Sequence, residues 1–185
     1  MKLKAWLIAL MAFAVVGCAS RGDPVDPKDE SLSLVYGYFD MKEAPSDLDW
    51  VFIKQYGNNK DEGYRVSAKD GVFMHVGVEP GSYQVATFGG SRFMRGDFEY
   101  DFGSKGRNRT ATRITKPGVY FFGSFQYVNH AGKGFFSADK FEMRAAKGPS
   151  EKEVLQKVIQ RLETESDLRD YKRTLQLAKQ RLGAL

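Results

Sequence analysis

The sequence predicts a mainly β protein: an antiparallel β-sandwich of about seven to nine strands, followed by a C-terminal segment of two helices. Between residues 32 and 143, short aromatic and β-branched runs alternate with Gly, Pro, Asn and Asp, which is typical of strands joined by turns. After residue 150 the apolar residues recur every three or four positions, which is the spacing of one helix face. The 185 residues, 42% of them hydrophobic, fit one globular domain and not a disordered chain.

The first 17 residues are predicted to be a cleaved signal peptide. Lys2 and Lys4 precede an apolar run at residues 5–16, AWLIALMAFAVV. A run of this length is typical of a secretion signal, whereas a membrane-spanning helix needs about 20 apolar residues. Removal of residues 1–17 takes away two lysines and no acidic residue, so the formal charge of +5 falls to +3.

Cys18 is the one cysteine of the chain, which excludes an internal disulfide and a multi-cysteine metal site. The stretch Val15-Val16-Gly17-Cys18 resembles the lipobox of bacterial lipoproteins. This resemblance implies cleavage before Cys18, a diacylglycerol on its sulfur and an acyl chain on its new amine, with no other cofactor. Two or more chains give stable membrane anchoring. The alternative is an ordinary signal peptide in which Cys18 is incidental.

The residue after the cysteine bears on location. Ala19 stands where an Asp would imply retention at the inner membrane, so the resemblance implies a lipid anchor in the cell outer membrane, with the body facing the periplasm. Residues 18–31 are predicted to be the lipidated cysteine and a flexible tether, because the stretch is polar and contains Pro24 and Pro27.

Residues 32–147 are predicted to form the sandwich. Phe98, Tyr100 and Phe102 alternate with acidic residues, as in a strand with one wet face. The run at 118–128 is apolar on both faces, which predicts an interior strand. The predicted strands are 32–41, 50–56, 63–68, 71–78, 83–88, 97–102, 110–115, 118–128 and 134–143.

Glu79-Pro80-Gly81-Ser82 is predicted to be a type II turn with positive φ at Gly81, joining the strands 71–78 and 83–88 as a hairpin. This pair resembles the hairpin of carboxypeptidase-regulatory-like and transthyretin-like sandwiches, and KPGVYFFGSF at 116–125 resembles a late strand of small envelope lipoproteins with that sandwich. The resemblance covers residues 32–143 and implies a non-enzymatic protein, since the members of this group are mostly non-enzymatic.

Residues 148–185 are predicted to form a helical pair. Ser150 and Glu153 make a capping box, and Ser166 is predicted to cap the second helix, which gives helices at about 150–163 and 167–182 that end at Gly183. Each helix carries an apolar stripe that must be buried. The pair is expected to dock on the sandwich. A second copy, or an envelope protein bound by a TPR-like helix pair, are the alternatives.

The sequence offers few residues for catalysis. The histidines are His75 and His130, and Ser91 lacks the surroundings of a nucleophile elbow, so the chain is predicted not to be an enzyme, with a hydrolase as the least supported reading. No metal site is expected. The acidic residues Asp40, Glu43, Asp47 and Asp49 favour a solvated loop over a calcium site, because an EF-hand spacing is absent.

A basic cluster at 104–116 and just before it is the candidate binding site: Arg92, Arg95, Lys105, Arg107, Arg109 and Arg113. Such a cluster could bind an anionic glycolipid such as lipopolysaccharide, or it could be a solvated loop. Nucleic acid is not an expected partner of an exported protein. The sequence therefore predicts a lipid-anchored envelope protein that acts by non-covalent interaction, with a glycan- or lipopolysaccharide-binding module as the alternative.

Overall fold

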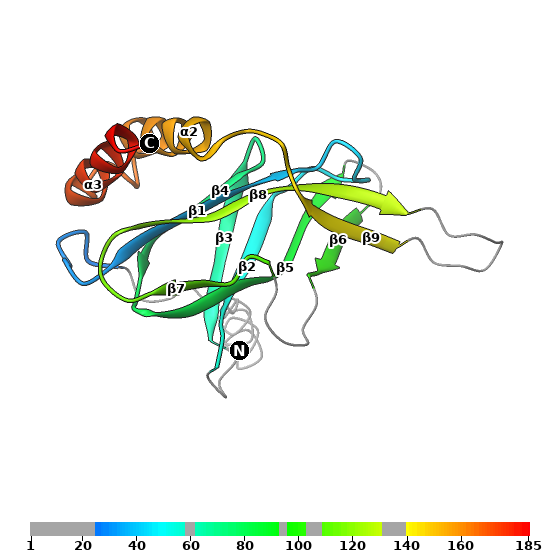
Figure 1. The fold of residues 1–185 in the computed structure, drawn as a ribbon, viewed down its shortest axis with the longest axis horizontal. Coiled ribbons are helices and arrows are strands. Elements are labelled where there is room, and N and C mark those ends of the chain that lie inside the picture. The colour runs from blue at the N-terminus through cyan, green and yellow to red at the C-terminus, as the bar shows by residue number, and fades with distance from the viewer. Residues whose placement is uncertain (1–24, 58–61, 93–95, 103–108, 131–139) are drawn as a thin grey trace, which may run out of the picture.

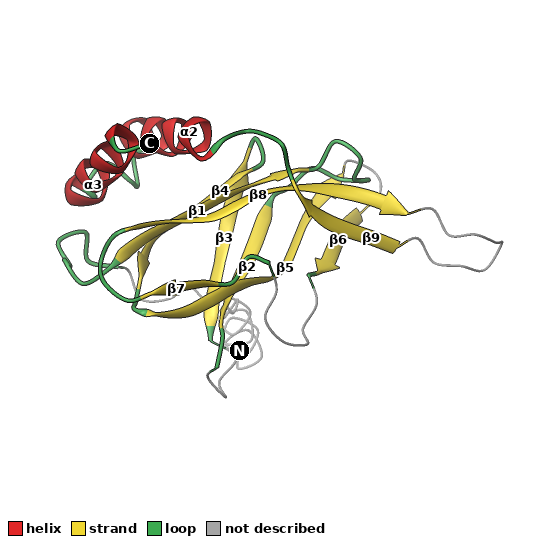
Figure 2. Ribbon diagram, viewed as in Figure 1, coloured by secondary structure: helices red, strands yellow, loops and turns green. Residues whose placement is uncertain are grey.

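Nine strands and two helices make up the part of the chain that the computed structural model describes, residues 25–57, 62–92, 96–102, 109–130 and 140–185 (Figures 1 and 2). The predicted mainly β class and the C-terminal helical pair are confirmed. The strands are β1 Ser33–Asp40, β2 Trp50–Gln55, β3 Gly63–Lys69, β4 Val72–Val78, β5 Gly81–Arg92, β6 Gly96–Asp101, β7 Thr112–Ile114, β8 Val119–His130 and β9 Lys140–Ala145. The helices are α2 Glu151–Thr164 and α3 Lys172–Gly183.

All nine strands belong to one strongly curled sheet, in the order β6-β5-β2-β3-β4-β1-β8-β9, with β7 paired to β5. The prediction of a purely antiparallel sheet is wrong, because β1 and β8 are parallel. A sandwich of two separate sheets is not confirmed. The parallel pair arises where the chain enters β8: Leu34 N–H donates to the Gly118 carbonyl at 2.9 Å, so both strands start at the same end of the sheet and run the same way.

The predicted hairpin of β4 and β5 is also wrong, because β3 and β2 lie between these strands in the sheet. Only Glu79 and Pro80 separate β4 from β5. Three Cα–Cα steps reach about 11 Å, whereas three strand spacings in a flat sheet need about 14 Å. The sheet must therefore curl, and the chain crosses its open end from one half to the other.

The predicted positive φ at Gly81 is not observed, and the residues with left-handed backbone lie elsewhere. Gly77 has φ 95°, and Asp70 and Gly71 have φ 51° and 76°. Lys69 pairs with Val72, so Asp70-Gly71 is the two-residue turn of the β3–β4 hairpin. Asp-Gly is favoured there because both central residues of this turn need positive φ.

The concave side of the curled sheet encloses an aromatic core. Phe39 lies at its centre, with ring centroids 5.1 Å from Phe88, 5.2 Å from Phe73 and 6.0 Å from Phe125. Tyr100 of β6 and Phe141 of β9 have ring centroids 5.1 Å apart, although these strands are the two ends of the sheet order. The curl thus brings the two edges of the sheet together, as Figure 1 shows at the end of β9.

A second apolar cluster joins the convex side of β1, β4 and β8 to the helices. Val154, Leu155 and Val158 of α2 are fully buried there, so the helical pair docks on the sheet and uses its apolar stripes to do so (Figure 2). Gly77 changes the face of β4: Val76 packs toward the helices and Val78 toward the aromatic core. The register between β1 and β4 shifts at this point, which is a β-bulge.

One of the two predicted N-terminal helix caps is observed and the other is not. The capping box is confirmed: Glu153 N–H donates to Ser150 Oγ at 3.3 Å, and Ser150 N–H donates to Glu153 Oε2 at 2.7 Å. The prediction that Ser166 caps the second helix is wrong, because α3 begins only at Lys172, after Tyr171. Leu168 and Tyr171 pack against the second apolar cluster, so tertiary contacts hold this turn where local capping predicts a helix.

Candidate functional site

A groove of about 650 Å³ opens where β1 ends. Its walls are the last residues of β1, the loop 41–49 and the turn between β3 and β4. The groove is lined by the side chains of two lysines and four aspartates, namely Lys42, Lys69, Asp40, Asp47, Asp49 and Asp70. Three of the four acidic residues that the sequence grouped, Asp40, Asp47 and Asp49, therefore line one surface.

Two of these carboxylates have structural partners. Asp49 Oδ2 accepts hydrogen bonds from the Ser91 N–H at 2.6 Å and the Ser91 hydroxyl at 2.8 Å, which ties the loop to β5. Asp40 lies 3.7 Å from Lys42 Nζ. Within the described residues no group of three His, Cys, Asp or Glu side chains is placed to hold a metal ion. The groove also contains the carboxylates of Asp47 and Asp70, which can accept hydrogen bonds from hydroxyl or amine groups of a ligand.

The predicted basic cluster does not form one patch among the residues the structure describes. Arg92 ends β5, whereas Arg113 pairs with Ser82 near the beginning of the same strand. Ten residues of strand separate these positions, or on the order of 30 Å. Arg109 is exposed beside Thr110, whose hydroxyl accepts a 2.8 Å hydrogen bond from Val85 N–H. Arg95, Lys105 and Arg107 lie outside the described residues.

The two histidines lie far apart on the sheet. His130 ends β8, and His75 lies in β4 with its ring centroid 4.7 Å from that of Tyr64. Burial lowers the pKa of His75 from its ordinary 6.5 to about 4, since burial disfavours the charged imidazolium. His75 is therefore neutral at pH 7.

His75 is expected to make stability depend on pH. The unfolded chain binds a proton at His75 near pH 6.5 and the folded chain only near pH 4. The contribution is complete above pH 6.5 and is lost as the pH falls toward 4, to a total of about 3 kcal/mol at most. Denaturant unfolding at pH 7.5 and 4.5 should show a smaller loss for His75→Gln than for the wild type. The carboxylates are the same in both proteins, so the difference between the two losses reports on His75 alone. Identical losses for His75→Gln and the wild type would contradict the prediction.

Residues 25–31 are held against the body, although the sequence places them in a flexible tether. Tyr171 donates its hydroxyl hydrogen to the Val25 carbonyl at 3.2 Å, and Arg173 donates to the Glu30 carbonyl at 2.7 Å. The Val25 side chain covers the Cα of Gly77, where an added Cβ would come within 2.6 Å of it. The sequence signal was Val25, the one large apolar residue between Ser20 and Leu32.

A partly buried polar contact links the sheet to both helices beside the second apolar cluster. The Tyr36 hydroxyl donates to Glu151 Oε1 at 3.0 Å, and Arg181 donates to the same oxygen at 2.9 Å. Burial and the neighbouring Glu151 carboxylate raise the pKa of Tyr36. The phenol is therefore a permanent donor, and the contact fixes α2 and α3 on β1.

Cys18 lies outside the described residues, as does the predicted signal peptide. None of the helices in the described part of the chain has the length and apolar character that crossing a bilayer requires. Comparison with models of protein families, with curated proteins and with solved structures gave no match to this chain. The functional proposal therefore depends on this chain's own residues.

Proposed function

We propose that the protein is a lipid-anchored envelope protein that acts by non-covalent interaction, held through Cys18 in the cell outer membrane and facing the periplasm. One observation carries the proposal: the lipobox-like Val15-Val16-Gly17-Cys18 stands directly behind a basic start and an apolar run of signal-peptide length. The body supports it, because a rigid sheet with a polar groove suits binding.

The layering of the fold supports a relation to transthyretin-like sandwiches better than the turn at Pro80 does. Phe39 of β1 and Phe88 of β5 come from opposite halves of the curled sheet, and their ring centroids are 5.1 Å apart. The two halves thus face each other across one core, as the two sheets of a sandwich do. We propose the relation on this layering alone.

The structure supports the two binding alternatives, a glycolipid site and an envelope protein bound by the helices, to different extents. The distance between Arg92 and Arg113 along β5 argues against a single glycolipid site that uses all six predicted residues. An envelope protein could still bind the helices, but through their polar outer faces, because the apolar residues of α2 already pack on the sheet.

Cys18→Ala tests the anchor. Cells fed an alkyne fatty acid are expected to label the wild-type protein, and the variant is expected to lose this label and to leave the membrane fraction, since only the Cys18 sulfur and its amine can carry the chains. Ser20→Ala leaves the lipobox intact and should label as the wild type does. Equal labelling of Cys18→Ala and the wild type would contradict the proposal.

A further inference from the structure

The first described residues, from Val25 on, lie at one end of the long axis of the molecule, where Figure 1 draws them in dark blue. Val25 lies on Gly77, and the flanking Val76 and Val78 pair with the first residues of β1. Leu34 of β1 in turn pairs with Val119, the first residue of β8. Val25 and the beginning of β8 therefore share one end of the body.

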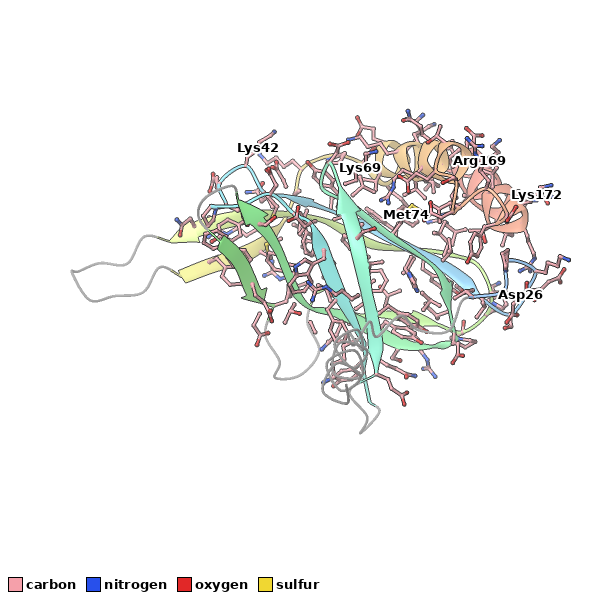
Figure 3. All side chains as sticks on the ribbon, turned by 180° about the vertical axis from the view of Figure 1, so that it is seen from behind. Asp26, Lys42, Lys69, Met74, Arg169 and Lys172 are labelled. Atoms are coloured by element: carbon pink, nitrogen blue, oxygen red, sulfur yellow. The ribbon has the colours of Figure 1, made fainter. Side chains whose placement is uncertain are left out.

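Two groups of residues form this end: 25–31, and the turn and first helical residues at 166–173. We call them the anchor-proximal face. Hydrogen bonds from Tyr171 and Arg173 join the two groups. Figure 3 places Asp26, Arg169 and Lys172 at this end, and Lys42 toward the other.

The length of chain before this face limits how the body can sit on a membrane. Cys18 and Val25 are seven residues apart, which a fully extended chain covers in about 25 Å. From Val119 to His130, β8 spans about 35 Å along the long axis. If the far end of β8 rested on the bilayer, Val25 would stand farther from the lipid than the chain can reach.

The charge of the anchor-proximal face does not select anionic lipid. It carries four basic and five acidic side chains, so its attraction to a negative surface is weak. The orientation must therefore follow from the short connection to the lipid.

Given the lipid on Cys18 that the proposed function assumes, we propose that the anchor-proximal face lies against the bilayer that holds this lipid. The groove at the end of β1 then points away from the membrane, because Lys42 and Lys69, which line it, lie at the ends of β1 and β3 remote from Val25. The groove is thus the surface that an envelope partner meets first.

Chemical anchoring tests the orientation. The chain from Cys18 to Leu185 has a single thiol, so it can be coupled to a maleimide phospholipid in phosphatidylcholine vesicles. A membrane-impermeant acetylating reagent then reports on four exposed lysines, Lys28, Lys172, Lys42 and Lys69. Against uncoupled protein with the same vesicles, acetylation of Lys28 and Lys172 should slow several-fold and that of Lys42 and Lys69 should be unchanged.

A variant with a long connection separates tether length from affinity. A Gly-Ser insert of about 20 residues after Ser20 lets the body move away from the bilayer, so the slowing at Lys172 should disappear. Slowing at Lys42 equal to that at Lys172, or no slowing at any of the four, would overturn the orientation. Because the lipid is attached chemically here, such a result leaves the fatty-acid labelling of Cys18 in cells as a separate question.

Discussion

Phe39→Ala is expected to lower the free energy of unfolding by about 3–5 kcal/mol, which is a large part of the 5–15 kcal/mol typical of a domain. Phe39 is 1% exposed and has four aromatic neighbours on both halves of the curled sheet. Phe73, Phe88 and Phe125 lie in β4, β5 and β8, and Phe102 directly follows β6. Alanine would leave a cavity at the point where these halves meet. Urea unfolding followed by circular dichroism measures the loss.

Two variants make the Phe39 measurement specific. Phe39→Leu keeps most of the volume and should cost less than the alanine variant. Tyr56→Ala removes an aromatic ring that is 43% exposed, and it should change stability by no more than about 0.5 kcal/mol. A loss for Phe39→Ala as small as that for Tyr56→Ala would mean that the aromatic core does not hold the curl together.

Local patterns in the sequence predicted the elements well. The strand at 50–56 is observed at Trp50–Gln55, and the interior strand at 118–128 is observed at Val119–His130, covered on both faces. Alternation and capping depend on neighbours in the chain, so a single sequence contains them. The Ser150–Glu153 capping box is of this kind.

The pairing of the strands could not be predicted in the same way. The parallel contact of β1 with β8 and the crossing from β4 to β5 depend on contacts between distant residues, which no local spacing encodes. Gly77 shows the limit: its bulge moves Val78 to the opposite face from Val76, whereas strict alternation places both together. A pattern of period two fails wherever one residue is inserted into the ladder.

The sequence grouped three acidic residues of the groove but interpreted them as a solvated loop, and it named the basic cluster as the candidate site. The acidic residues Asp40, Asp47 and Asp49 meet at the groove because Asp40 ends β1 and the other two lie in the loop that follows it. Arg92 and Arg113 looked close because 21 positions of glycine-rich sequence separate them, but β7 pairs with the beginning of β5 and Arg92 lies at its end. The contacts of residues 25–31 with α3 bridge more than 140 positions, so the sequence alone could not show them.

Leu155→Ala is expected to cost about 2–5 kcal/mol, because the side chain is fully buried between α2 and the convex side of β1 and β4. The loss should also loosen α3, which packs on α2 and holds residues 25–31 through Tyr171 and Arg173. Hydrogen exchange should therefore rise in residues 25–31 as well as in the helices.

The matched control is Gln156→Ala, the next residue, which is exposed and should behave as the wild type. Faster exchange confined to α2 would show that the helices do not secure the start of the body. Faster exchange at both places would mean that the helical pair holds residues 25–31 on the sheet through Tyr171 and Arg173.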